Sequence, residues 1–153
     1  MILRFRKIVI VIGAVFLLAG LSFSQGTCSE AGSIKRVKNT NIGRYEYVVF
    51  DIIKPNEPDY KVETRKPPFT DYSGDETFKI KGKKFKVISF SSLNWMCNPK
   101  ETFRLSRRSI KDIKELYTFE GYADYVVGYN SRYVGTYHYD VGSIRKVVMR
   151  FRK

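Results

Sequence analysis

Turn-forming residues divide most of this 153-residue chain into short segments. Within the segments, apolar and aromatic residues alternate with polar ones, which is the period of a strand. The clearest segment covers residues 45–53, where Val48, Phe50 and Ile52 fall on one face. Turns recur about every 8 to 15 residues, and no fixed repeat is present. The pattern predicts an all-β fold, an antiparallel β-sandwich of about seven to nine short strands.

The remaining segments differ in how clearly they predict strands. Residues 77–80 and 85–90 flank a Lys-Gly-Lys-Lys sequence that is typical of a hairpin turn. Residues 91–114 are less regular, and we expect one short helix as an option there. In the last strand we expect Val147, Met149 and Phe151 to point inward. Further strands are expected at residues 60–64, 116–119, 122–129, 133–139 and 144–151.

The N-terminus predicts export. Residues 1–24 contain three cations, then an uncharged apolar run over residues 8–23, then serines at positions −3 and −1 of a cut before Gln25. These are the three parts of a secretory signal peptide. One alternative is an uncleaved anchor, although a spanning helix needs about 20 apolar residues. A second is a lipoprotein with Cys28 lipidated, although the preceding residues do not match a lipobox.

Two further parts follow the signal peptide. Residues 25–43 are polar, and we expect a flexible leader that adds at most one short strand near residues 34–37. Residues 44–153 predict a single β domain, and a mature chain of this length can bury a core. We expect the exported protein to lie in the periplasm, the cell envelope or the extracellular space.

Two cysteines, Cys28 and Cys97, are present in the whole chain. In an exported protein a single pair is a candidate for one disulfide. The bond would close the long loop between Cys28 and Cys97, which would stabilise the fold by about 4 kcal/mol in the entropic account. Two unpaired thiols in a reducing or oxygen-free habitat are the alternative.

Basic residues dominate the charge of the predicted mature chain. It keeps 25 of the 28 Lys and Arg and all 15 acids, a formal charge of +10. Such a domain attracts wall carboxylates, envelope phosphates and lipid head groups. The alternative is a solvated surface whose strand lysines prevent edge-to-edge pairing. The candidate ligand-binding cations are Lys79, Lys81, Lys84, Lys86, Arg107 and Arg108.

Aromatic residues are candidates for specific contacts. Six tyrosines fall between residues 122 and 139. Their rings could pack on sugar faces while their hydroxyls form hydrogen bonds, or they could serve core and cross-strand packing. We select Trp95, Tyr129 and Tyr133 as the exposed contacts.

The sequence does not favour an enzyme or a metal site. A hydrolase needs a nucleophile, a base and an orienting group, whereas His138 is the only histidine and no Gly-x-Ser-x-Gly occurs. One histidine and two distant cysteines do not make a four-ligand zinc site. Asp71, Asp75 and Glu76 could approach calcium, but they lack EF-hand spacing, and a solvated acidic loop is preferred. We expect no catalytic residue, metal or cofactor.

Several segments resemble, in order, the AMIN-like domain of secreted and lipid-anchored bacterial envelope proteins. They are Arg44-Tyr-Glu-Tyr-Val-Val-Phe-Asp51, Pro58-Asp-Tyr-Lys-Val-Glu63, Phe119-Glu-Gly121 and Val127-Gly-Tyr129. The resemblance covers roughly residues 44–151. Three features depart from the family: Arg150 stands near a usual Asp, Tyr125 replaces Trp, and residues 91–109 have no counterpart.

The resemblance implies a β-sandwich without catalytic residues. The related AMIN domain is thought to bind peptidoglycan, so we expect an exported domain that binds peptidoglycan or an anionic wall polymer and serves localisation. The alternative is an assembly subunit that binds another exported protein through a sheet edge or a Tyr-rich face. Nucleic-acid binding has no recognisable motif here. Membrane contact is expected only if the signal segment is retained.

Overall fold

The computed structural model describes residues 28–105 and 109–153. The predicted signal peptide, Arg107 and Arg108 lie outside the described residues. Eleven strands and no helix occur within the described ranges, which confirms the all-β prediction with more strands than expected. The strands are β1 (Ile34–Ile42), β2 (Tyr45–Ile53), β3 (Asp59–Thr64), β4 (Phe69–Thr70), β5 (Thr77–Phe78), β6 (Lys84–Ser91), β7 (Lys100–Thr102), β8 (Ile110–Phe119), β9 (Tyr122–Tyr129), β10 (Arg132–Val141) and β11 (Ile144–Arg152).

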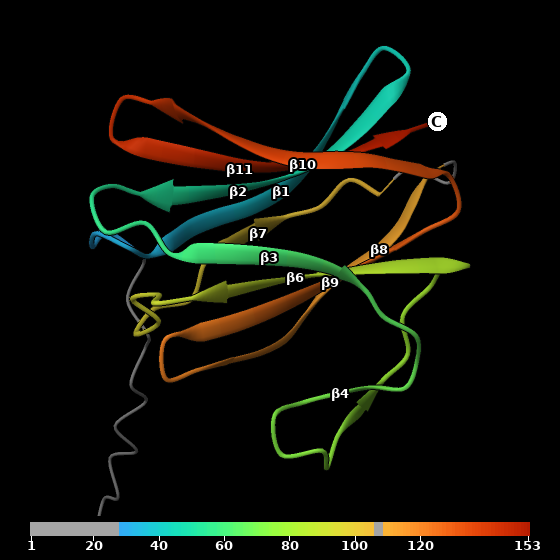
Figure 1. Cartoon of the computed structure of the whole chain (residues 1–153), viewed down its shortest axis with the longest axis horizontal. Helices are drawn as coiled ribbons and strands as arrows, with labels where there is room; N and C mark the ends of the chain where they lie inside the picture. The colour runs from blue at the N-terminus through green and yellow to red at the C-terminus, as the bar shows by residue number, and fades with distance from the viewer. Residues whose placement is uncertain (1–27, 106–108) are drawn as a thin grey trace, which may run out of the picture.

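Two main sheets pack face to face as a β-sandwich (Figure 1). The five-stranded sheet has the order β10-β11-β2-β1-β7, and the four-stranded sheet has the order β3-β6-β9-β8. All neighbours are antiparallel except β1 and β7. A short β4–β5 ribbon forms a separate sheet below them in Figure 1.

The main core lies between the two sheets. Phe50 on β2 packs against Phe90 on β6 and Tyr125 on β9, with ring centroids 5.0 and 5.2 Å apart. On β11, Val147, Met149 and Phe151 are fully buried, as predicted from their alternation. Rings in tilted or edge contact stabilise such a core beyond the area they bury.

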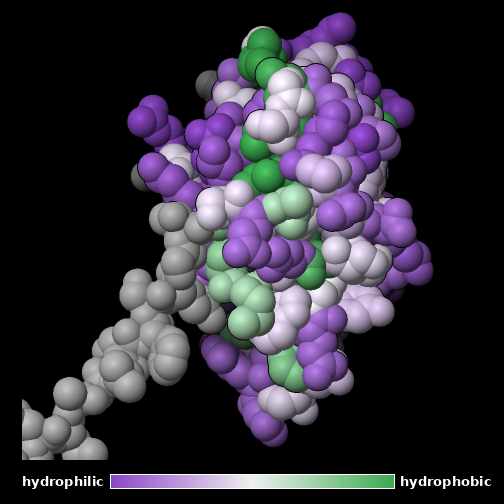
Figure 2. Space-filling model, turned by 90° about the vertical axis from the view of Figure 1, so that its left-hand side faces the viewer, coloured by the Kyte–Doolittle hydropathy of each residue, from purple (hydrophilic) through white to green (hydrophobic). Residues whose placement is uncertain are grey.

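A second apolar cluster lies on the other side of the four-stranded sheet. Phe69 of β4 packs there on Phe85 of β6, with centroids 5.1 Å apart, and Val87 and Val126 are buried beside them. The β4–β5 ribbon therefore covers part of the side of the four-stranded sheet that faces away from the main core. On the end of the molecule in Figure 2, hydrophobic residues form only a narrow band between hydrophilic ones.

The predicted hairpin of residues 77–80 and 85–90 is wrong. β5 pairs with β4, whereas β6 pairs with β3 and β9. The intervening segment crosses β9 at Gly128, where a Cβ would stand 2.0 Å from the Lys81 carbonyl oxygen. Glycine thus serves a close backbone approach here, because no other residue leaves room.

The flexible leader over residues 25–43 is also wrong for much of its length. Residues 34–42 form β1, which pairs along its length with β2. Ile34 and Val37 enter the core, and Asn39 is buried while its side chain binds both backbone groups of Arg104. The segment looked polar because its other residues face outward from the sheet.

The short helix expected within residues 91–114 is not present in the described part of that range. β7 and the start of β8 lie there instead. Among the described residues, no helix is long and apolar enough to cross a membrane.

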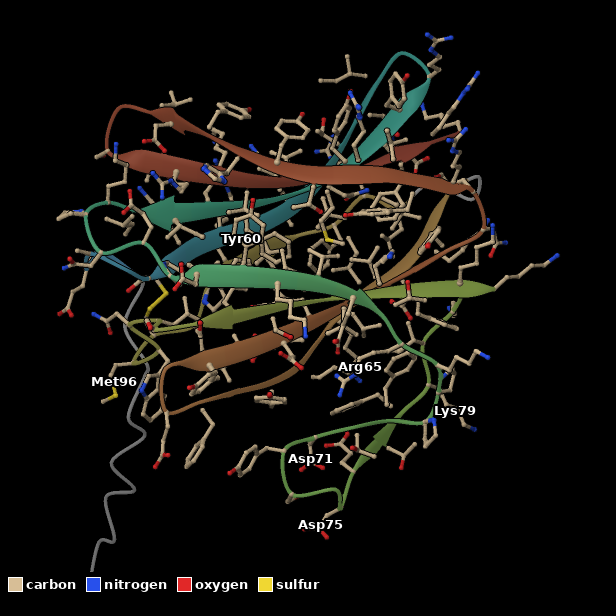
Figure 3. All side chains as sticks on the ribbon, viewed as in Figure 1. Tyr60, Arg65, Asp71, Asp75, Lys79 and Met96 are labelled. Carbon is tan, nitrogen blue, oxygen red and sulfur yellow. A yellow bond between two sulfur atoms is a disulfide. The ribbon has the colours of Figure 1, made fainter. Side chains whose placement is uncertain are left out.

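Polar contacts join the two sheets at their sides (Figure 3). Tyr60 on β3 and Nδ1 of His138 on β10 lie 3.0 Å apart in a hydrogen bond. The backbone N–H of Ile110 on β8 donates to Oε2 of Glu46 on β2 at 2.7 Å. The only histidine in the sequence is exposed and bridges two sheet edges.

The disulfide prediction is confirmed. Cys28 and Cys97 are bonded, with their Cα atoms 5.1 Å apart. The bond ties the segment before β1 to the loop between β6 and β7. Disulfide bonds of this kind form and persist in oxidising compartments.

Replacement of Ile34 tests whether β1 belongs to the core. We expect Ile34→Ala to lower the free energy of unfolding by about 2–5 kcal/mol, because it leaves a cavity. Thr40→Ala, at an exposed position of the same strand, should change it by less than about 0.5 kcal/mol. Urea unfolding measures both, and equal effects would contradict the placement of β1.

Removal of the disulfide should destabilise the fold. We expect the double variant Cys28→Ser/Cys97→Ser to lose about 2–5 kcal/mol, since a long loop is no longer closed in the unfolded chain. Thiol reductant should lower the urea midpoint of the wild type and leave that of the double variant unchanged. A wild-type midpoint insensitive to complete reduction would refute a stabilising role.

Candidate functional site

The predicted basic residues do not form one patch. Lys79 and Lys81 are exposed between β5 and β6, beside the β4–β5 ribbon (Figure 3, Lys79 labelled). Lys84 Nζ donates to the Ser131 carbonyl at 3.5 Å. Lys86 Nζ donates to Thr64 Oγ1 at 2.7 Å and lies 4.7 Å from the ring centroid of Tyr133. The four lysines are separated because the hairpin that would have united them does not form.

The predicted aromatic contacts are mostly engaged in packing. Tyr129 is only 5% exposed, so its selection as a surface contact is wrong. It lies on β9, which is buried on both faces, and alternation there does not expose every second residue. Tyr133 is half-buried against Phe151. Trp95 is half-buried with its ring centroid 6.0 Å from that of Phe119.

A different surface gathers cations and rings: the side of the five-stranded sheet that faces away from the core. The register places seven Lys or Arg and four Tyr on this side, with one carboxylate, Asp51. We call it the outer face. Its cations and tyrosines are Arg36, Lys38, Lys100, Arg132, Lys146, Arg150, Arg152, Tyr45, Tyr47, Tyr137 and Tyr139.

Rings and a guanidinium lie on the part of the outer face formed by β10, β11 and the start of β2. Tyr137 and Tyr139 stack with centroids 6.2 Å apart, and they are 41% and 46% exposed. The Arg150 guanidinium lies 5.2 Å from the Tyr45 ring centroid. Burial, with a contribution from Tyr47, raises the pKa of Tyr137 above its usual value. Tyr137 therefore stays neutral, and the tyrosines of this face present ring faces and hydroxyls beside cations.

Arg150 is held in place without saturating its donors. Its Nε is buried and has no hydrogen-bond partner in the described part of the chain. Beside it in the register, Val148 and Val49 are buried although they lie on the outer face. The long side chains that flank these valines in the register cover them.

At the end of the face nearest the disulfide, Asp51 joins two cations. Arg36 donates to its Oδ2 from Nε at 2.8 Å and from Nη2 at 2.5 Å. Lys146 donates from Nζ to its Oδ1 at 2.5 Å. Asp51 is 2% exposed, and burial alone would raise its pKa. Hydrogen bonds from Lys146 and Arg36 outweigh that effect and hold the pKa below its usual value.

In the acidic loop considered for calcium, the carboxylate of Asp71 is engaged by groups of the loop itself. Asp71 accepts hydrogen bonds from the Ser73 hydroxyl at 2.6 Å and the Glu76 N–H at 3.0 Å. These bonds lower the pKa of Asp71. Figure 3 shows Asp71 and Asp75 in the loop of the β4–β5 ribbon. No group of metal-ligating side chains occurs in residues 28–105 and 109–153.

The outer face was missed because its strands are distant in the sequence. The alternation of β2 and β11 was visible, but β11 follows β2 by about 90 residues, and no local pattern shows that the two pair. The arrangement can bind anions: it offers guanidinium and ammonium donors on rigid strands, with tyrosine hydroxyls between them.

Removal of the Asp51 carboxylate should destabilise the protein in a pH-dependent way. A folded-state pKa below the unfolded value means the carboxylate stabilises above about pH 4, with loss as the pH falls through the folded pKa. We expect Asp51→Asn to cost about 1.5–3 kcal/mol at pH 7. The difference from wild type should shrink steadily below pH 4. Urea unfolding at several pH values measures it, and a pH-independent difference would contradict the assignment.

Comparison of the chain with protein-family models, curated proteins and solved structures found no match. What can be inferred of function therefore comes from the residues themselves, and above all from the outer face.

Proposed function

We propose that this protein is a non-catalytic, exported domain that binds an anionic polymer of the cell envelope and is retained there through that contact. The observation that carries the proposal is the outer face, with seven cations against one carboxylate. An excess of one sign on a single face attracts a polyanion and orients its approach. The formal charge of the whole chain, +13, acts in the same direction.

The geometry of the outer face suits an extended chain better than a small molecule. From Asp51 to Tyr45 along β2 is six residues, or about 20 Å at the rise of a strand. Cations occur in every cross-strand row along this length, from Lys146 to Arg152. A polymer lying along the face would meet guanidinium and ammonium groups for its anions and tyrosine rings for its sugar units.

Two further observations support an envelope location. The disulfide fits an oxidising compartment, as expected of an exported chain. The resemblance of residues 44–151 to AMIN-like domains, which we retain as a proposal, also supports a location in the cell envelope. In that family the related AMIN domain is thought to bind peptidoglycan, so binding to bare glycan is the competing result of the test below.

A second candidate function is assembly with another exported protein through β10. This strand is ten residues long and stands at one edge of the five-stranded sheet. Val134, Tyr137, Tyr139 and Val141 on it are exposed. An exposed edge can accept a partner strand. The bulge between Tyr133 and Gly135 interrupts its register and makes this use less favourable.

Binding to isolated sacculi, before and after removal of their anionic polymers, tests the proposal. We expect the purified protein to pellet with intact sacculi and to remain in solution with stripped ones. Raising the salt to about 0.15 M, where charges are screened beyond about 8 Å, should weaken pelleting. Pelleting with stripped sacculi would show that the ligand is glycan and not the anionic polymer. Failure to pellet with intact sacculi would contradict the proposal and favour the assembly function.

Matched variants locate the contact. Lys38→Gln/Arg152→Gln removes two charges from the outer face and should weaken binding about tenfold, or about 1.4 kcal/mol. Lys79→Gln/Lys81→Gln removes the same charge beside the β4–β5 ribbon and should change binding by less than about twofold. Equal losses in both would show attraction by net charge without a defined face.

A further inference from the structure

A surface cavity of about 760 Å³ opens at the disulfide end of the outer face. It lies where the chain after Cys28 meets the start of β1, the end of β2, the start of β11 and the residues before β7. The side chains of Lys35, Arg36, Lys100 and Lys146 line it, together with Asp51. Four cations around one carboxylate give the lining a formal charge of +3.

Only two of these cations are paired with the carboxylate. Asp51 uses both of its oxygens on Arg36 and Lys146. Lys35 and Lys100 are exposed and make no ion pair with a described residue. Asp51 thus orients two cations at the cavity wall, and the other two keep their full donor capacity for a ligand.

The backbone holds the cations in position. A β-bulge between Ile34 and Arg36 leaves Lys35 unpaired, and Lys35 and Arg36 both line the cavity. The parallel pairing of β7 with β1 sets Lys100 opposite Arg36. Cys28 and Ile53 also line the cavity, and they are held by the bond to Cys97 and by the hydrogen bond from Gly32 N–H to the Ile53 carbonyl. Donors on strands lose little freedom when a ligand binds.

We propose that this cavity is a phosphate subsite that binds a phosphodiester group of the envelope polymer; the inference rests on the proposed function and names the polymer's chemistry. The lining surrounds a volume with donors from three different strands and from the bulge. A phosphodiester group exposes oxygens on a tetrahedral centre and can accept from Arg and Lys at different angles. A planar carboxylate would engage one or two of the four cations.

The position of the cavity favours a polymer over a free ion. Lys146 and Arg36 belong both to the cavity and to the first cross-strand row of the outer face. A polymer with one phosphate in the cavity could therefore extend along the outer face, over the rows that hold Lys38 and Arg150. A chain with repeating phosphates gains from both contacts at once, since the second binding event is intramolecular.

Titration of the oxidised protein with poly(glycerol phosphate), followed by amide chemical shifts in NMR, tests the subsite. We expect the largest shifts at Lys35, Arg36, Lys100 and Lys146. Lys35→Gln/Lys100→Gln should weaken binding at least about tenfold. The matched control Lys79→Gln/Lys81→Gln should remain within about twofold of wild type. Unchanged shifts of core amides, such as that of Phe50, check that each variant is folded.

Three further probes decide the ligand chemistry and its source. Poly-glutamate of similar length should bind at least about tenfold more weakly, and equal affinity would overturn the phosphate assignment. Inorganic phosphate that binds as tightly as the polymer would indicate a free ion as the ligand. Tighter binding to phosphatidylglycerol vesicles, lost in Lys35→Gln/Lys100→Gln, would indicate a lipid head group. Either result would overturn the assignment to a polymer.

The sacculus assay separates failure of the subsite from failure of the proposed function. Retention that depends on Lys38 and Arg152 but not on Lys35 and Lys100 would overturn the cavity and leave the outer face as the binding surface. Binding of poly(glycerol phosphate) at the cavity without retention on sacculi would support the phosphate subsite and overturn the envelope polymer as its source.

Discussion

The register of β2 against β1 and β11 determines both the core and the outer face. In this register Phe50 pairs with Val37 and Val147 inside the sandwich, and Asp51 pairs with Arg36 and Lys146 outside it. A slip of one residue would exchange the two sets, placing a carboxylate in the core and a phenyl ring in water. The central strand of the sheet thus has one solution that satisfies both of its faces.

Asp51 strengthens this choice because a buried carboxylate is costly without partners. Its two cations come from different strands, and both must be present for its oxygens to be satisfied. The net gain in stability from such a group is modest, whereas the penalty for leaving it unpaired is large. The same contacts hold Arg36 and Lys146 at the wall of the cavity, so the device that specifies the register also prepares the site.

The sequence predicted the strands that alternate strongly and missed those that do not. Residues 45–53, 122–129 and 144–151 were located because their apolar periods are clear, and the sandwich followed from them. β1 was missed because its outward residues are polar and its buried Asn39 is satisfied by the distant Arg104 backbone. The hairpin predicted after β5 was wrong because the segment that follows β5 crosses β9 instead. It does so at Gly128, where the Lys81 carbonyl comes too close for any side chain.

The outer face was beyond sequence reasoning for a related reason: its members come from five strands that are distant in the sequence. Charge density along the chain pointed to Lys79–Lys86, whereas pairing across the sheet produced the dense cationic surface elsewhere. Tyr129 illustrates the same limit for rings, since burial on both faces of β9 removed it from the surface. Local patterns report which faces a strand has, and only tertiary pairing decides which residues share a surface.

The segment between β6 and β8 contributes one side of the cavity. Residues 91–109 supply Cys97 to the disulfide, Asn98 to the cavity lining and Lys100 to the parallel pairing beside Arg36. A sandwich without this segment would keep the outer face but lose a border of the cavity and one of its cations. In the function that we propose, this segment would determine ligand preference, and the sheet would attract polyanions in general.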